Sequence, residues 1–244
     1  MRNAIPRFSI CVPVSIAHKE QMIYLEELFI SISKQTFSNF ELIVSDDSDS
    51  KNVSQLCTQM GLQGLPIKLV SNPNRGISQN LNYCIENSKA EFVKIVFQDD
   101  FFYTANVLAE INAEIERTDF VWYVSACNHF SQQDQKFYEE FFPRKTSNLL
   151  RGHNTISSPS VVTFRRNSFE PFSNKLTYLL DCEWYLRMSH KHGLPVFGKS
   201  VHVTNRVHSH QATNWAKEYL ESEVEISKMM HSEVRMGHRV CLCN

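Results

Sequence analysis

The chain has 244 residues, which is long enough for one large domain or two small ones with a sizeable buried core. Of these residues 42% are hydrophobic and 21% are charged, as is typical of a globular protein. Its 25 basic and 26 acidic residues give a formal net charge of −1, which argues against a nucleic-acid binder held by counterion release. Proline and arginine interrupt the N-terminus where a signal peptide needs an apolar core, and no window approaches the roughly 18 apolar residues of a membrane span.

The first hundred residues alternate short apolar strands with helical patterns. Strands are predicted at Phe8–Val14, Phe40–Ser45, Ile67–Ser71 and Glu91–Phe97, with helices at Glu20–Gln35, 51–60 and Ile77–Asn87 between them. Strand–helix units in series favour parallel strands joined by right-handed crossovers. The predicted fold class is therefore α/β, with a single Rossmann-like mixed sheet that is mainly parallel and flanked by helices.

The second half is less regular. A helix is predicted from Thr104 to Arg117, followed by the strand "FVWYVSA" and a polar, aromatic stretch over 128–148. Another strand is expected over Ser160–Arg166. The segment "YLLDCEWYLRMSHKHG" predicts a helix that ends at Gly193, and residues 214–230 are amphipathic.

Polar residues follow three of the predicted strands: "DDSDS", "SNPNRG" and "QDD". In parallel sheets, ligands bind outside the carboxyl ends of the strands. The adjacent Asp99 and Asp100 repel each other and resist burial, so their position between apolar segments calls for a compensating partner. The chain has no G-x-G-x-x-G, P-loop or G-x-S-x-G motif, so a cation is the expected means of neutralising a bound phosphate.

Each polar segment also has a simpler interpretation. "DDSDS" is a normal Asx turn and helix cap, "NPNRG" is an ordinary turn, and "QDD" is typical of the start of a helix. Asp181 is equally a favourable charge at a helix N-terminus. Four such explanations in this order are less economical than one site at the sheet edge.

Four ordered segments carry a family resemblance. The opening segment is "FSICVPVSIAHKEQMIYLEELFISISKQTFSNFELIVSDDSDS", and "NPNRGISQNLN", "AEFVKIVFQDD" and "DCEWYLRM" follow it. Together they resemble an inverting family 2 glycosyltransferase of the bacterial surface-polysaccharide type, over about residues 7–190. The resemblance implies a glycosyltransferase A fold, a nucleotide-sugar donor, with a UDP-sugar expected, and Mn²⁺ or Mg²⁺ as cofactor.

The same resemblance implies roles for individual residues. Asp47 would hydrogen-bond the nucleobase, supported by Asp46. Asp99 and Asp100 would form the metal and ribose motif, with Asp100 as the expected direct metal ligand. The remaining donor-binding candidates are Pro13 and Val14 at the base pocket, and Arg75 and Asn80 near the diphosphate or sugar. Phe97 stands where many members of the family carry the first acid of this motif.

Transfer to an acceptor hydroxyl also needs a base on the side opposite the leaving group, worth about 10²–10⁴-fold in rate. Asp181 and Glu183 are both candidates because they open the same predicted helix, and the family resemblance implies Asp181 as the general base with Glu183 as the alternative. One base acting in line predicts inversion at the anomeric carbon. Arg165 and Arg166 are candidates for an acidic acceptor, and His208 is a candidate near the diphosphate.

We expect one domain over 1–244, with a nucleotide-sugar-binding half at about 7–100, an acceptor and catalytic half at about 101–213, and a C-terminal helical segment at 214–244. The seven irregularly spaced cysteines favour a reduced, cytosolic protein. If the acceptor is a glycan or lipid-linked molecule, we expect the protein to contact the inner face of the membrane where it meets that acceptor. The alternatives are a sugar-nucleotide nucleotidyltransferase and a non-catalytic nucleotide- or carbohydrate-binding relative.

Overall fold

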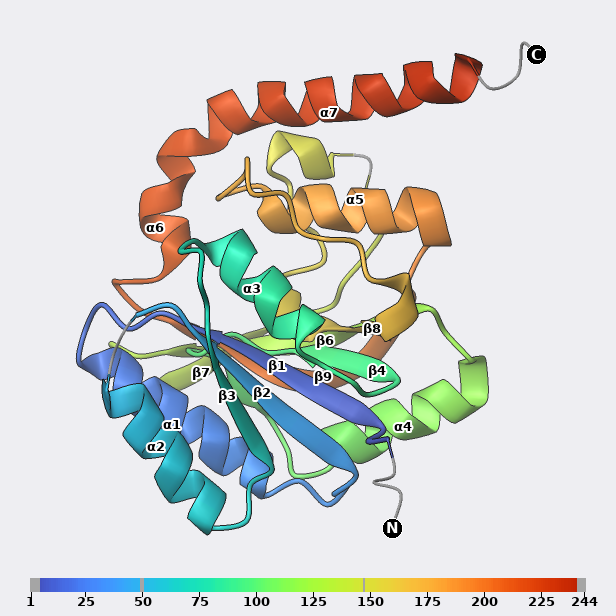
Figure 1. The fold of residues 1–244 in the computed structure, drawn as a ribbon. Coiled ribbons are helices and arrows are strands. Elements are labelled where there is room, and N and C mark those ends of the chain that lie inside the picture. The colour runs from blue at the N-terminus through green and yellow to red at the C-terminus, as the bar shows by residue number, and fades with distance from the viewer. Residues whose placement is uncertain (1–4, 49–50, 147, 241–244) are drawn as a thin grey trace.

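A computed structural model describes residues 5–48, 51–146 and 148–240 of the chain (Figure 1). Its strands are β1 (Phe8–Val14), β2 (Phe40–Asp46), β3 (Ile67–Ser71), β4 (Phe92–Ile95), β5 (Phe101–Phe102), β6 (Trp122–Ser131), β7 (Lys136–Phe141), β8 (Val162–Arg165) and β9 (Val196–Val207). Its α-helices are α1 (Glu20–Ser33), α2 (Lys51–Leu62), α3 (Ile77–Glu86), α4 (Val107–Thr118), α5 (Leu180–His192), α6 (Ala212–Ala216) and α7 (Leu220–Val240).

One mixed sheet runs in the order β3-β2-β1-β4-β8-β6-β9-β5, with β7 paired to β6. The β3-β2-β1-β4 half is parallel, whereas β8 is antiparallel to both β4 and β6. The chain moves outward from β1 to β3 through α1 and α2 and then returns to β4 through α3. Right-handed crossovers therefore place α1 and α2 on one face of the sheet and α3 on the other, as Figure 1 shows.

Burial explains why the parallel half lies in the centre. All seven residues of β1 are buried, as expected for a strand covered by helices on both faces. Helix α1 turns one apolar stripe to the sheet, made up of Tyr24, Leu25, Leu28, Phe29 and Ile32. The five cysteines in the described ranges are free and buried, so they pack in the core.

Helices α5 and α7 form the side of the molecule above α3 in Figure 1, with α7 lying across α5. Glu223 of α7 accepts hydrogen bonds from the backbone N–H groups of Thr177, Tyr178 and Leu179, at 2.7, 2.9 and 2.8 Å. These amides immediately precede α5, so a buried carboxylate from the C-terminal helix fixes the start of α5.

The predicted α/β fold with a mixed sheet is confirmed. The sequence patterns did not predict β5, β7 or β9. β5 has only two residues, and β7 is exposed along most of its length, so neither shows a buried periodic pattern. Within the described ranges, no helix is long and apolar enough to cross a membrane.

Candidate active site

The carboxyl ends of β1, β2 and β4 lie at one edge of the sheet because these three strands are parallel and adjacent. The N–H of Asp47 donates to Val14 O at 3.1 Å, and the amide of Asn80 donates to the same carbonyl at 2.9 Å. Gln98 holds the continuation of β1, since its side chain accepts from Ser15 N at 2.7 Å and donates to Ser15 O at 2.9 Å.

Asp47 is buried and faces the loop before α3, where its Oδ2 accepts from Gly76 N at 3.0 Å. Gly76 has φ of +131°, a conformation that side chains disfavour, so glycine is suited to this position. Asn80 lies one helical turn after Gly76, in α3, and is 3% exposed. The Oδ1 atom of its side chain has no hydrogen-bond partner among the described residues. Arg75 lies exposed on the same loop.

Asp46 ends β2 and turns its carboxylate to its own loop. Its Oδ1 accepts from the backbone N–H and the hydroxyl of Ser48, the Asx turn anticipated from the sequence. Asp47, rather than Asp46, therefore bridges β1, β2 and the loop before α3. Pro13 and Val14 are buried at the end of β1 beside these two residues.

Asp99 and Asp100 follow β4 and differ in exposure. Asp100 is 5% exposed, and its Oδ1 accepts from Arg206 N at 3.1 Å. Burial raises the pKa of the Asp100 carboxyl to about 8, and the neighbouring charge of Asp99 adds to this effect. The Asp99 side chain is 25% exposed. Two acidic oxygen donors with excess negative charge fit a hard divalent cation, which often uses one or two carboxylates together with substrate phosphates.

His208 approaches this pair from the segment after β9. Its Nε2 lies 3.0 Å from Asp99 Oδ2, and its Nδ1 accepts from His210 N at 3.3 Å. Because Nδ1 is an acceptor, Nε2 carries the proton and donates to Asp99. In the ranges described, no group of three or more histidine, cysteine or acidic side chains is arranged to hold a metal ion.

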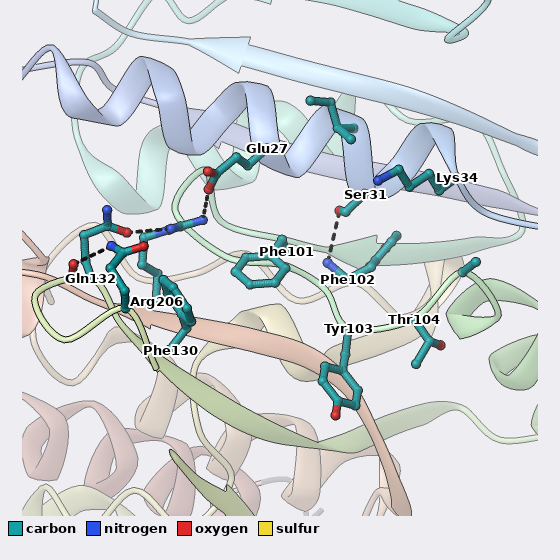
Figure 2. A pocket seen from close by; sticks show the side chains of 13 residues that line it. Glu27, Ser31, Lys34, Phe101, Phe102, Tyr103, Thr104, Phe130, Gln132 and Arg206 are labelled. Carbon is teal, nitrogen blue, oxygen red and sulfur yellow. Dashed lines mark hydrogen bonds and ion pairs between the residues drawn. The ribbon is translucent and has the colours of Figure 1, made fainter. Parts of the chain in front are cut away.

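Arg206 lies beneath the same two acids, with its side chain only 3% exposed. Figure 2 shows its guanidinium between Glu27 of α1 and Gln132 of the β6–β7 hairpin. These residues form one end of a hollow of about 380 Å³. The hollow is also lined by Phe101, Tyr103, Phe130, Ser31 and Lys34, whereas Asp47, Asn80 and Asp181 do not line it.

Asp181 lies in the first turn of α5, within hydrogen-bonding reach of the loop before β8. Asn154 Nδ2 donates to Asp181 Oδ2 at 2.7 Å. Burial raises the pKa of Asp181 to about 6, although hydrogen bonds from Cys182 and Asn154 oppose the shift. A carboxyl with this pKa is ionised at neutral pH and is more basic than an ordinary aspartate, as a general base requires.

Glu183 has a different environment from Asp181. It is 1% exposed and accepts two hydrogen bonds from Arg187, at 2.9 and 2.8 Å. Burial alone would raise its pKa, but the hydrogen bonds from Arg187 and His231 outweigh burial and lower it. Its carboxylate is thus engaged by the guanidinium group of Arg187 on the same helix.

Arg165 and Arg166 lie at the opposite end of β4 from the acidic pair. Arg165 pairs with Phe92 in the sheet register and forms ion pairs with Glu91 and Asp119. Arg166 donates to Ala90 O at 3.1 Å, just before β4 begins. Both guanidinium groups are thus held at the amino end of the strand whose carboxyl end leads to Asp99.

Sequence reasoning also missed several polar residues around the acids. Asn154, Ser157, Ser158 and Asn205 connect Asp181 with Asp100 through side-chain and backbone hydrogen bonds. They lie in irregular chain or on β9, where no periodic pattern marks them. Their shared feature, small polar side chains near predicted strand ends, was the available signal.

Comparison with known proteins agrees with this architecture. The family model "Glycosyl transferase family 2" matches residues 9–173, so the chain belongs to that family and is a glycosyltransferase. An uncharacterized glycosyltransferase of Rickettsia typhi is 28% identical over 233 residues, which is 88% of this chain and 69% of the relative.

Two solved structures have the same fold. S. aureus TarS 1–349 in complex with UDP has a TM-score of 0.66 and 17% identity, over 91% of this chain and 65% of that chain. The mannosyltransferase PcManGT of Pyrobaculum calidifontis, in complex with GDP-Man and Mn²⁺, has a TM-score of 0.63 and 13% identity, over 98% of this chain and 81% of the other. The glycosyltransferase A fold expected from the sequence is confirmed. The chain thus spans about two thirds of the length of the Rickettsia relative and of TarS 1–349.

Proposed function

We propose that this glycosyltransferase moves a sugar from a nucleotide diphosphate sugar to a hydroxyl group of a glycan or lipid-linked acceptor, with inversion at the anomeric carbon. The observation that carries the proposal is the connection between Asp181 and the Asp99–Asp100 pair through one short loop. Asn154 contacts Asp181, and Ser158 Oγ lies 3.4 Å from Asp100 Oδ2. A basic carboxylate and an acidic pair suited to a cation therefore border the same segment.

The donor half of this proposal rests on the edge formed by β1, β2 and β4. Asp47 would recognise the nucleobase beside Pro13 and Val14, with Asp46 supporting the turn. Arg75 and the unpartnered Oδ1 of Asn80 would face the diphosphate or sugar. TarS was solved with UDP and PcManGT with GDP-Man, so the chain's structural relatives include proteins bound to either type of nucleotide.

A divalent cation, Mn²⁺ or Mg²⁺, would be held by Asp99 and Asp100 together with donor phosphates. Bound there, the cation would neutralise charge on the departing diphosphate. Asp99 offers the more exposed carboxylate, and Asp100 the buried one, whose pKa is raised first by burial and then by the charge of Asp99. The PcManGT structure, which contains Mn²⁺, is consistent with such a cofactor.

Asp181 would remove the proton from the acceptor hydroxyl. The acceptor oxygen then forms a bond to the anomeric carbon while the bond from that carbon to the diphosphate oxygen breaks. We propose Asp181 rather than Glu183 as this base because Glu183 is engaged by Arg187. We leave Arg165 and Arg166 out of the acceptor site because the ion pairs of Arg165 and the hydrogen bond from Arg166 to Ala90 O hold them at the far end of β4.

The test is the release of nucleoside diphosphate from UDP-glucose, UDP-N-acetylglucosamine, GDP-mannose and dTDP-rhamnose, with Mn²⁺ and a panel of glycan acceptors. The Asp181→Asn variant should lose about 10²–10⁴-fold in transfer while binding the nucleotide as well as wild type does. Asp134→Asn, which changes an exposed acid on the β6–β7 hairpin, is the matched control. Wild-type rates in the Asp181→Asn variant would refute the assigned base.

A further inference from the structure

The side-chain amide of Asn154 is fully used in hydrogen bonds around Asp181. Its Oδ1 accepts from Ile156 N and Ser157 N, each at 2.9 Å. Its Nδ2 donates to Asp181 Oδ2 at 2.7 Å and to Ser157 O at 3.0 Å. An amide oxygen cannot donate, so two backbone N–H groups on one side fix which end of the amide faces the carboxylate. Asp181 therefore receives an N–H donor.

The loop that carries Asn154 is held from several directions. Ser157 has φ of +87°, a conformation that is strained for a non-glycine residue and persists only where its surroundings enforce it. Tyr185 Oη donates to Ser157 O at 2.9 Å, and Asn205 Nδ2 donates to Ser157 Oγ at 2.8 Å. These contacts, from α5 and β9, offset the strain and make the loop a defined spacer between the two acidic sites.

We propose that Asn154 is a positioning residue that keeps the carboxylate of Asp181 ionised and holds it in the orientation needed to accept the acceptor's proton. This inference rests on the proposed function, in which Asp181 is the general base. An N–H donor stabilises the charged form of a carboxylate over the neutral form. Asn154 thereby offsets part of the burial that would otherwise keep Asp181 protonated.

Three other titratable groups face Asp181, and of these Cys182 already donates a hydrogen bond to it. Tyr178, Cys182 and Tyr185 interact electrostatically with Asp181, and the pKa of each is raised, first by burial and then by the carboxylate's charge. All three are neutral near pH 7 and supply no positive charge. Removing the amide donor of Asn154 should therefore shift the protonation of Asp181.

The test variant is Asn154→Asp. The new carboxyl keeps an oxygen for the N–H groups of Ile156 and Ser157, but it loses the donor and places a second acid beside Asp181. The acidic limb of the kcat/KM–pH profile should move up by about one pH unit or more, so the rate at pH 6 falls at least about fivefold and recovers as pH rises. A purely structural role would lower the rate equally at every pH.

Asn82→Asp is the matched control. The Asn82 amide also holds a loop, donating to Phe172 O at 2.8 Å and accepting from Phe172 N at 2.7 Å. The pH profile of this variant should match that of wild type. An equal shift in both variants would overturn the inference.

A second measurement separates this inference from the proposed function. Carboxyl ¹³C NMR titration of Asp181, assigned by the signal lost in Asp181→Asn, requires no sugar donor and is made on the folded protein. A higher pKa of Asp181 in Asn154→Asp than in wild type supports the inference, and an unchanged or lower pKa overturns it. If that pKa rises but Asp181→Asn transfers sugar at the wild-type rate, the assigned base fails while the influence of Asn154 on Asp181 stands.

Discussion

Arg206 is the residue whose replacement most directly tests how the acidic pair is supported. Its Nε donates to Asp99 O at 3.0 Å, and one terminal nitrogen donates to Gln132 at 2.7 Å. The other terminal nitrogen pairs with Glu27, whose side chain is 49% exposed. The guanidinium also lies over the rings of Tyr24, Phe101 and Phe130, at 4.5, 5.1 and 5.7 Å from their centroids.

Arg206→Met keeps most of the apolar packing and removes these polar contacts. Two hydrogen bonds from a charged donor contribute roughly 1.5 kcal/mol each. The pair with half-exposed Glu27 adds only about 0–1 kcal/mol, and a cation–π contact about 0.5–1 kcal/mol. We expect a loss of about 4 kcal/mol in the free energy of unfolding, which for this chain length lowers Tm by about 8–16 °C. Differential scanning fluorimetry measures this directly.

Arg117→Met is the control. The side chain of Arg117 is 69% exposed and pairs with Glu114 within α4, so the Tm of the Arg117→Met variant should equal that of wild type. A fall in Tm of less than about 2 °C for Arg206→Met would refute the reasoning, because it would mean that these contacts stabilise the fold hardly at all.

Two further predictions concern α5. Asp181 must be ionised to act as a base, so kcat/KM should fall about tenfold per pH unit below its pKa of about 6; a rate independent of pH between about 5 and 7 would contradict this. Glu223→Ala leaves three backbone N–H groups unpaired and should lower the free energy of unfolding by about 2–4 kcal/mol, measured by urea denaturation. Glu221→Ala, exposed on the same helix, should have no effect, and equal losses in both variants would contradict the capping role.

The parallel half of the fold was predictable because local patterns and topology agree there. β1 and β3 have the predicted bounds, Phe8–Val14 and Ile67–Ser71, and β2 extends one residue further, to Asp46. Each is a short strand rich in apolar residues, and polar segments follow β2 and β3 as they follow β4. Because parallel neighbours end at one edge, this pattern also predicted that the three polar segments would meet.

The second half was less predictable because several of its strands form by pairing with strands that are distant in sequence, and their own residues show no clear alternating pattern. β9 contains the exposed Lys199 and Ser200 and pairs with β6 and β5, which are distant in sequence. Its location brings Arg206 and His208 to the acidic pair. The pairing of Glu183 with Arg187 illustrates a similar limit, since the sequence places Asp181 and Glu183 in one turn without showing which carboxylate is free of a cation.

The most direct test of the central claim is the thermal stability of the protein with UDP, GDP, CMP and dTDP, each with and without Mn²⁺. Wild type, Asp99→Asn and Asp100→Asn are compared, with Asp134→Asn as the control. One nucleotide at about 100 times its Kd should stabilise wild type and the control by about 2.7 kcal/mol, or about 5–11 °C, only with Mn²⁺, and this shift should disappear in the Asp100→Asn variant. Absence of stabilisation by every nucleotide, or an equal shift without Mn²⁺ and in both acidic-pair variants, would contradict a metal-dependent donor site at Asp99 and Asp100.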